Sequence, residues 1–327
     1  MNVYNKIIVK SVIETIFKNN FSKDLFDNYI DYLEFNNKNC LNFNFENEII
    51  SESVFGNRLY FSYHFGPFLY IQYFLLTKKN IDLIFIASKY SEDKVKSFIN
   101  FAKKNNIKFD ESCVIYADSF TGLKEVINAM KNNKALFTLI DIGAGQGTIQ
   151  SSKNSTEINL INSKIYVRNS IFNISKKMNF PITQVLTYWE ENKRVLKFKD
   201  FDSNNFSIKS SWHDFENLLN KFPNQWESYH TIYKFFKIEL ENADAIFEND
   251  DTYYFQNDNF ILICENENNL LFSKVSFTFY KISTRFTDII NSCIADKIKF
   301  KLNEINDLID NTNLIKELIK NKIINKC

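Results

Sequence analysis

The stretch Arg58-Leu-Tyr-Phe-Ser-Tyr-His64-Phe-Gly-Pro67 gives the first clear indication of the fold. Its apolar run is typical of a buried strand, and Gly66-Pro67 marks the end of that strand, because glycine and proline interrupt sheet pairing. Residues 68–76 then predict a helix. The order is therefore strand, glycine turn and helix, which is the repeating unit of an α/β sheet.

The same unit recurs along the chain. Further strands are predicted at 81–87, 114–117, 135–141, 165–167 and 182–188, with a hairpin partner at 194–198. Helices are predicted at 92–105, 122–131, 170–178 and 212–222, and residues 4–33 also read as helical. Continuous apolar strands alternating with helices predict an α/β fold with a mostly parallel central sheet flanked by helices.

The C-terminal part of the chain follows a different pattern. Among 327 residues there are only 6 glycines and 3 prolines, and none of them follows Pro223. Short strands are predicted at 252–255, 259–264 and 270–272, and helices near 274–282, 284–295, 302–310 and 312–323. We therefore expect two domains, 1–242 and 243–327, the second a small α+β module.

Composition narrows the classes of function. The 45% hydrophobic content and 34 phenylalanines are ample for a packed core, and the net charge of +1 gives no field that favours nucleic acid. The five cysteines are widely spaced and odd in number, which argues against a zinc site or a disulfide framework. Residues 1–23 lack the apolar core of a signal peptide. We expect a cytoplasmic protein without cofactor or metal.

Two motifs compete for the chemistry. Asp141-Ile-Gly-Ala-Gly-Gln-Gly147 follows a predicted strand and resembles the first motif of class I methyltransferases, which bind S-adenosylmethionine. Such a turn should open into a helix, but residues 148–157 read as loop. Methyl transfer is therefore the least favoured alternative.

The second motif is Tyr63-His64-Phe65-Gly66-Pro67-Phe68. A histidine at the carboxyl end of a central strand lies where open α/β sheets bind their ligands. His64 is either a catalytic base or a polar group satisfied within the fold.

The order of motifs between about 50 and 235 resembles the lauroyl/myristoyl lipid A acyltransferases. His-Phe-Gly-Pro-Phe-Leu at 64–69 is similar to that family's His-Phe-Gly-Asn-Trp-Glu segment. The helix, basic turn and strand that end at Asp141, the small helix before Pro181, and Phe222-Pro-Asn-Gln-Trp-Glu-Ser-Tyr-His230 follow in the family's order. Trp226 and His230 thus match positions of its closing signature, although both also suit packing under the sheet.

This resemblance implies that His64 is the general base of a His-x4-Asp/Glu pair, which activates an acceptor for attack on an acyl thioester. Leu69 stands at the position of the acid. Three explanations stay open: another carboxylate replaces the acid, with Asp141 as the first choice; the base works unassisted; or the site is inactive and the domain is a scaffold.

The resemblance also suggests binding residues. Gly66, Pro67 and Phe68 adjoin the base, and Phe65, Phe68 and Tyr70 would line an acyl tunnel or simply fill the core. Arg168 would bind the phosphates of a carrier arm, or else form a surface salt bridge.

The predicted second domain, residues 243–327, resembles a PqqD-like domain. The likeness lies in the pattern of its strands, in Lys274-Val-Ser-Phe-Thr-Phe-Tyr-Lys-Ile282 and in its last helix. That likeness implies a winged-helix-like fold and the capture of an extended peptide by an edge strand. The alternative is a module that only packs on the rest of the chain.

Together the two resemblances imply an acyltransferase that uses an acyl carrier protein or coenzyme A thioester. Its acceptor would be the amine of a ribosomally made peptide. The alternatives are a non-catalytic peptide-binding scaffold and a lipid or glycolipid acyltransferase with peripheral contact to the inner face of a membrane.

Overall fold

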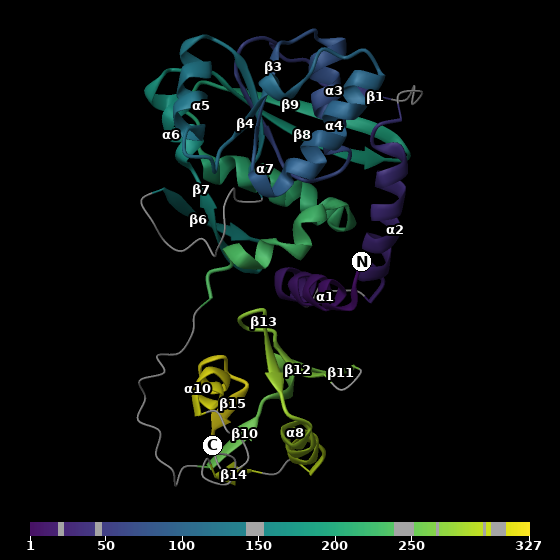
Figure 1. Cartoon of the computed structure of the whole chain (residues 1–327), viewed down its shortest axis with the longest axis vertical. Coiled ribbons are helices and arrows are strands. Elements are labelled where there is room, and N and C mark those ends of the chain that lie inside the picture. The colour runs from purple at the N-terminus through teal and green to yellow at the C-terminus, as the bar shows by residue number, and fades with distance from the viewer. Residues whose placement is uncertain are drawn as a thin grey trace. The chain divides into compact units, whose positions relative to one another are not determined.

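A computed structural model describes residues 1–18, 23–42, 48–141, 154–238, 252–265, 268–296, 299–301 and 312–327. The chain divides into an N-terminal unit, Met1–Lys237, and a C-terminal unit, Ile238–Cys327 (Figure 1). The sequence predicts a boundary between residues 242 and 243, and this division falls five residues earlier.

A seven-stranded sheet forms the centre of the N-terminal unit (Figure 1). Its order is β1-β9-β8-β2-β5-β3-β4, and the five strands from β8 to β4 are parallel. β9 runs antiparallel to β8 and parallel to β1. The predicted mostly parallel α/β sheet is confirmed. The strands are β1 (Glu48–Ile50), β2 (Leu59–Ser62), β3 (Leu83–Ala87), β4 (Val114–Tyr116), β5 (Ala135–Leu139), β8 (Ile182–Glu190) and β9 (Lys193–Phe201).

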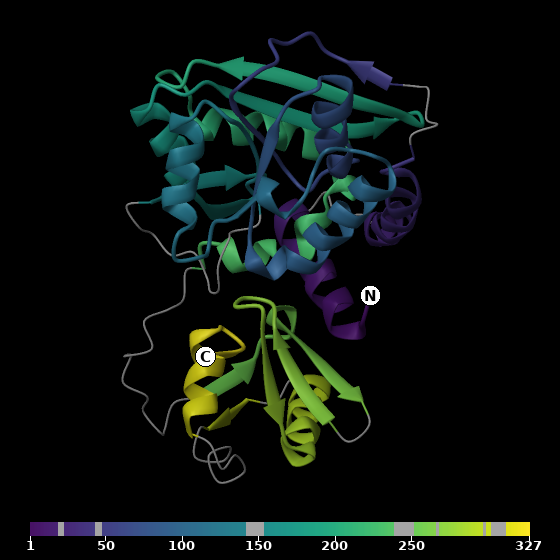
Figure 2. The same ribbon diagram turned by 45° about the horizontal axis from the view of Figure 1, so that its top comes forward.

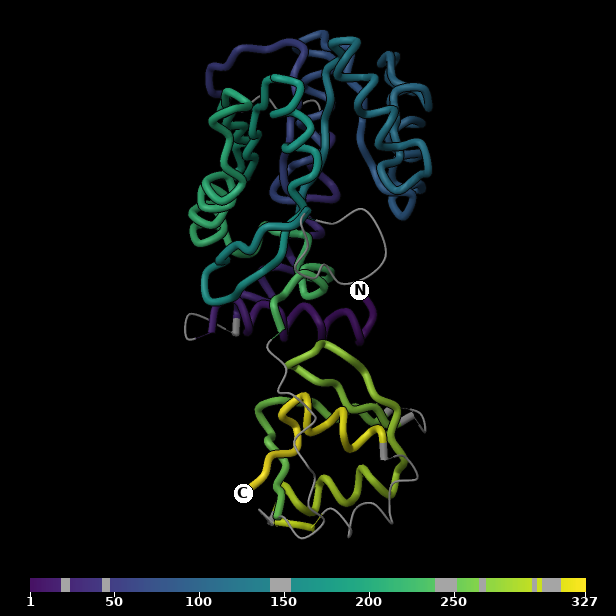
Figure 3. Tube along the Cα trace, turned by 90° about the vertical axis from the view of Figure 1, so that its left-hand side faces the viewer, coloured from purple at the N-terminus to yellow at the C-terminus, as the bar shows by residue number. Residues whose placement is uncertain are grey.

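Helices cover both faces of this sheet. Neighbouring residues of a strand point to opposite faces, and because the parallel strands are largely apolar, both faces need to be covered. Tyr60 packs into an aromatic core beneath α3 (Phe68–Tyr73), the π-helix η2 (Phe74–Lys78) and α4 (Glu92–Lys104). Phe61, the next residue, faces Phe172 of α6 (Ser170–Lys177), with ring centroids 5.0 Å apart. Figure 3 shows α4 and α7 (Ile208–Lys221) on opposite sides of the sheet.

The connections change direction at β2. From β2 the chain passes through α3 to β3 and through α4 to β4, and then returns through α5 (Gly122–Lys131) to β5, between β2 and β3. It continues to β8 on the other side of β2. The carboxyl ends of β2 and β5 therefore lie side by side at a topological switch point, the place where such sheets bind ligands.

The remaining elements of this unit surround the sheet. β6 and β7 form a separate antiparallel hairpin, and the helices α1 and α2 contact the short helices that follow α7. These elements are α1 (Val3–Phe17), α2 (Lys23–Asn39), β6 (Ser155–Leu160), β7 (Ser163–Arg168), η3 (Lys89–Ser91), η4 (Glu111–Cys113), η5 (Pro223–Gln225), η6 (Glu227–His230) and η7 (Ile232–Phe235).

The prediction of loop through residue 157 is wrong for 155–157, which begin β6. Only the second half of this strand carries apolar side chains, the buried Ile158 and Leu160. Its polar first half is held by pairing with β7 instead, so that the apolar pattern alone understates its length.

The C-terminal unit contains two small antiparallel sheets, β14-β10-β15 and β11-β12-β13 (Figure 2). Buried side chains of β10, β12, α8 and α10, among them Phe255, Leu271, Phe286 and Leu318, form its core. The elements are β10 (Thr252–Phe255), η8 (Asn257–Asn259), β11 (Phe260–Glu265), β12 (Asn268–Ser273), β13 (Thr278–Ile282), α8 (Thr284–Asp296), β14 (Phe300–Lys301), α10 (Thr312–Lys320) and β15 (Ile324–Lys326).

The helix predicted near 274–282 is wrong, because residues 278–282 are β13. Cross-strand packing decides this segment, since the ring of Phe279 lies 4.7 Å from that of its β12 partner Phe272. The last predicted helix ends at Lys320 rather than 323, and the helix predicted at 302–310 lies outside the described residues. Within the parts of the chain that the structure describes, no helix is long and apolar enough to cross a membrane.

A fully buried arginine joins the N-terminal helices to the sheet. Arg194 of β9 donates to the carbonyl oxygens of Asn39 and Asn42 at 3.0 and 2.8 Å and to Glu48 Oε1 at 3.2 Å. Its guanidinium stacks 3.8 Å from the ring centre of Tyr70. The cation thus satisfies carbonyl groups at the C-terminal end of α2, where a helix has no internal donors left.

Replacing Arg194 should therefore unfold the unit more easily. We expect Arg194→Met to lower the free energy of unfolding by about 3 kcal/mol, because buried acceptors lose their charged donor. Urea titration followed by circular dichroism measures the change. Arg168→Met, at an exposed arginine, is the matched control and should change stability by less than about 0.5 kcal/mol. Equal effects of the two variants would contradict this role of Arg194.

Candidate functional site

Two predicted site residues meet at the carboxyl edge of the sheet. His64 follows β2 and Asp141 follows β5, and the paired ends Ser62 and Leu139 bring them together. His64 Nδ1 lies 2.8 Å from Asp141 Oδ1. The sequence of each strand fixes this contact, because both side chains come two residues after the last paired position.

Asp141 is a buried carboxylate surrounded by donors. The backbone N–H of His64 donates to its two oxygens at 3.0 and 2.9 Å. Trp226 Nε1 and Ser228 Oγ each donate to Oδ2 at 2.7 Å. These donors come from the turn after β2 and from the segment after α7, so one carboxylate joins three separate parts of the chain.

The donors keep Asp141 ionised. Burial by itself would raise the pKa of this carboxyl, but the charge of His64 and the hydrogen bonds from His64, Trp226 and Ser228 lower the pKa below its ordinary value. An ionised carboxylate can only accept, so His64 Nδ1 must carry the shared hydrogen. Nε2 of neutral His64 is then unprotonated and available as a base.

The imidazole stands at the surface of this edge. The His64 side chain is 17% exposed, and among the described residues only Asp141 hydrogen-bonds to the ring. Its other neighbour is the ring of Phe68, at the start of α3, whose centroid lies 4.9 Å away. The arrangement supplies an oriented base with one open nitrogen.

The turn after His64 requires glycine. Gly66 has φ +60°, and a Cβ at this position would lie 2.5 Å from the carbonyl oxygen of Thr187 and 2.6 Å from the Cα of Tyr188. Gly66 N–H donates to the carbonyl oxygen of Gln225 at 3.0 Å, and Pro67 is the N-cap residue of α3. Gly66 and Pro67 therefore set the course of the chain beside the base.

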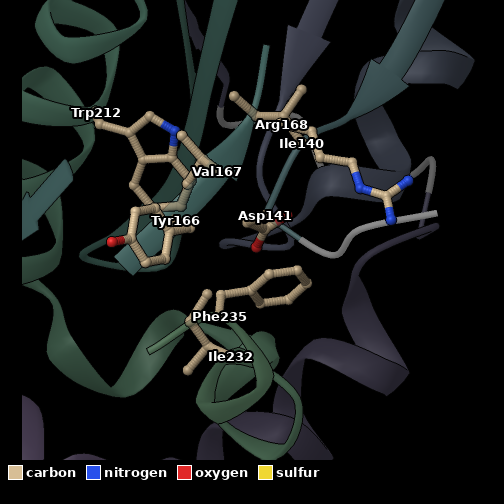
Figure 4. Close-up of a pocket in the computed structure, with 8 residues that line it drawn as sticks. All are labelled: Ile140, Asp141, Tyr166, Val167, Arg168, Trp212, Ile232 and Phe235. Carbon is tan, nitrogen blue, oxygen red and sulfur yellow. The ribbon is translucent and has the colours of Figure 1, made fainter. Parts of the chain in front are cut away.

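Arg168 and Asp141 line one pocket (Figure 4). Arg168 is exposed at the end of β7, and its guanidinium points away from Trp212 on the opposite wall. The rest of the lining is apolar or aromatic and comprises Ile140, Tyr166, Val167, Ile232 and Phe235. No described residue forms an ion pair with Arg168, so the salt bridge expected as its alternative role does not occur among these residues.

Leu69 lies in the core rather than in the site. It is partly buried and packs against the cluster that includes Tyr60, Phe74 and Phe198. Among the described residues, the acid that contacts the His64 ring is Asp141. The glycines of the competing motif, Gly143, Gly145 and Gly147, lie outside the described residues.

No sequence pattern marks Glu227 as a residue of the site, although it lies in the segment 222–230. Phe65 and Trp226 form an antiparallel bridge, and Glu227 N–H donates to the His64 carbonyl oxygen at 2.8 Å. Glu227 is therefore the direct cross-strand partner of His64, and the two side chains point to the same side of this ribbon. No periodic pattern marks the pairing, because it joins two irregular segments.

Asn36 of α2 holds Glu227 in place. Its Nδ2 donates to Glu227 Oε1 at 2.8 Å and to the carbonyl oxygen of Gly66 at 3.1 Å, while its Oδ1 accepts from Trp189 Nε1 at 2.9 Å. Burial raises the pKa of the Glu227 carboxyl, although Asn36 and the charge of His64 oppose the change. The hydrogen bond from Asn36 and the charge of His64 thus offset only part of the cost of burying the Glu227 carboxylate.

His230 completes the segment. Its Nδ1 lies 2.7 Å from the carbonyl oxygen of Glu227, which makes Nδ1 the donor, and burial lowers the pKa of its imidazole. The contact fixes the turn that carries Glu227.

Within the described residues, no group of three or more His, Cys, Asp or Glu side chains could hold a metal ion.

No protein-family model matches the chain, and no curated protein sequence matches it significantly.

The pH dependence of stability tests the state of Asp141. Because its folded pKa lies below the ordinary 3.8, the carboxylate stabilises the fold above that pH, and the contribution is lost as the pH falls through the folded pKa. We expect Asp141→Asn to lower the free energy of unfolding by about 2–4 kcal/mol at pH 7. In urea titrations the difference from wild type should shrink below pH 3.8. A difference that stays constant with pH would contradict an ionised Asp141.

Gly66 and Gly56 form a matched pair of substitutions. Both have positive φ, but a Cβ at Gly56 meets no atom within 4 Å. Gly56→Ala should therefore cost only backbone strain, about 1–3 kcal/mol. Gly66→Ala should cost about 2 kcal/mol more, because its Cβ overlaps the backbone of β8. Thermal and urea unfolding measure both changes, and similar losses would mean that the close approach at Gly66 relaxes freely.

Proposed function

We propose that the chain is an acyltransferase in which His64 is the general base. The observation that carries this proposal is the contact between His64 Nδ1 and the buried carboxylate of Asp141. It leaves Nε2 to accept a proton from the attacking group. The order of motifs, which resembles the lauroyl/myristoyl lipid A acyltransferases, supports acyl transfer over other reactions that need a base.

In the proposed reaction, the acceptor loses a proton to His64 Nε2 as it attacks the carbonyl carbon of an acyl thioester. The tetrahedral intermediate then collapses, the carbon–sulfur bond breaks, and the thiolate takes the proton from the imidazolium. Asp141 stabilises that imidazolium in the role of the acid that Leu69 cannot fill. No serine or cysteine among the described residues bonds to His64, which favours direct transfer over a covalent acyl-enzyme.

The donor would be a thioester of coenzyme A or of an acyl carrier protein. Arg168, exposed at the edge of the pocket beside Asp141, is the cation available for a phosphate of the carrier arm. Gly66, Pro67 and Phe68 would shape the surface next to the reacting atoms.

The C-terminal unit would bring in the acceptor. We propose that it is a PqqD-like, winged-helix-like domain that binds an extended peptide. The support is its antiparallel sheet, in which β11 and β13 each pair with β12 on one side only. Such an edge offers backbone donors and acceptors to an added strand.

Substitution of His64 tests the proposed reaction. The full chain is incubated with coenzyme A thioesters of two to sixteen carbons and with amine and hydroxyl acceptors, and mass spectrometry follows free coenzyme A and acylated product. His64→Gln should lower the rate by about 10²–10⁴-fold, the usual share of a general base. His213→Gln, at a histidine whose side chain is 68% exposed on α7, should leave it unchanged. Equal rates for His64→Gln and wild type, or no transfer by the wild type, would contradict the proposal.

A further inference from the structure

Glu227 is a carboxyl group placed beside the base but not used by it. It lies opposite His64, next to the bridge between Phe65 and Trp226, and its N–H donates to the His64 carbonyl oxygen at 2.8 Å. The structure describes no salt bridge to Glu227, and its one side-chain hydrogen bond within the described residues comes from Asn36 to Oε1. Oε2 has no hydrogen-bond partner among the described residues, so it is the oxygen that a ligand could engage.

The groups around Glu227 supply little positive charge. Tyr29 and Tyr32 of α2, and Cys40 directly after it, interact electrostatically with Glu227, and burial raises the pKa of each, so that all three are uncharged at neutral pH. Asp141 adds negative charge, and the cations that act on Glu227 are His64 and the exposed Lys94 of α4, neither within 4 Å. A half-buried carboxylate is costly unless a cation pairs with it.

We propose that Glu227 binds the protonated primary amine of the acceptor, so that the proposed transferase acylates amines. This inference rests on the proposed function and names its acceptor class. A charge-assisted hydrogen bond from the ammonium to Oε2 would supply the missing cation and hold the nitrogen beside His64 Nε2. A hydroxyl acceptor would leave the carboxylate unpaired.

The protons balance in this arrangement. The carbon–nitrogen bond forms and the carbon–sulfur bond breaks, and the ammonium nitrogen gives up two protons. His64 Nε2 takes them in turn, passing one to the leaving thiolate and the other to solvent. Glu227 orients the ammonium, and His64 performs the transfer.

The coupling between protonation of Glu227 and binding of a cation supports the same assignment. Burial raises the pKa of Glu227, and a bound cation favours the ionised carboxylate. Ammonium binding should therefore release protons from the protonated fraction of Glu227, and affinity should rise with pH through its titration.

Calorimetric titration of the full chain without thioester tests the site separately from the reaction. Hexylammonium chloride is the probe, and hexan-1-ol is the neutral control. We expect wild type to bind hexylammonium at least 10-fold more tightly than hexan-1-ol. Glu227→Gln should remove that preference, and Glu111→Gln, at an exposed glutamate before β4, should retain it.

Two further arms complete the experiment. Nα-acetyl-lysine amide and glycine amide distinguish a lysine side chain from a terminal amine as the source of the ammonium, and binding of either supports the proposal. The folded Glu227→Gln chain should be at least as stable at pH 7 as wild type, because the raised pKa means that the charged carboxyl is disfavoured in the fold. Equal affinity of wild type for hexylammonium and hexan-1-ol, or undiminished preference in Glu227→Gln, would overturn the inference even where acyl transfer depends on His64.

Discussion

The buried carboxylate of Asp141 is the interaction on which the site depends. It lies at the end of β5 and accepts from the backbone and ring of His64, from Trp226 and from Ser228. Removing such a group from water is costly, and here the cost is offset by donors from two segments that are far apart in the sequence, the turn after β2 and the segment after α7. The same bonds that keep it ionised also fix the tautomer of His64, so the stability of this edge and its chemistry have one cause.

The second carboxyl has the opposite environment. Glu227 receives one hydrogen bond from Asn36, and burial raises its pKa, whereas the donors around Asp141 lower its pKa. Carboxyls with oppositely shifted pKa values near one histidine suit different roles. Asp141 suits the role of partner to the base, and Glu227 suits the role of substrate binder. Asn36 links this difference to α2, because it also bonds to Gly66 and Trp189.

Much of the sheet could be predicted from the sequence because its strands are continuous apolar runs that end at polar or glycine-containing turns. The shared sheet edge also gave a reason to expect Asp141 near His64. The predictions for β6 and β13 are wrong because pairing with a neighbouring strand, rather than apolar content, stabilises their polar residues. Glu227 and Asn36 could not be found from periodicity, since their contact joins a polar position of α2 to a short helix 191 residues further along the chain.

The most direct test of the account is the tautomer of His64, which nitrogen-15 NMR of histidine-labelled protein measures at a pH of about 8, where an ordinary histidine is neutral. The spectrum of the His64→Gln variant assigns the His64 signals among the three histidines. We expect a protonated Nδ1 and an unprotonated Nε2 in wild type, and loss of that preference in Asp141→Asn. A wild-type His64 protonated at Nε2 would contradict its role as the base.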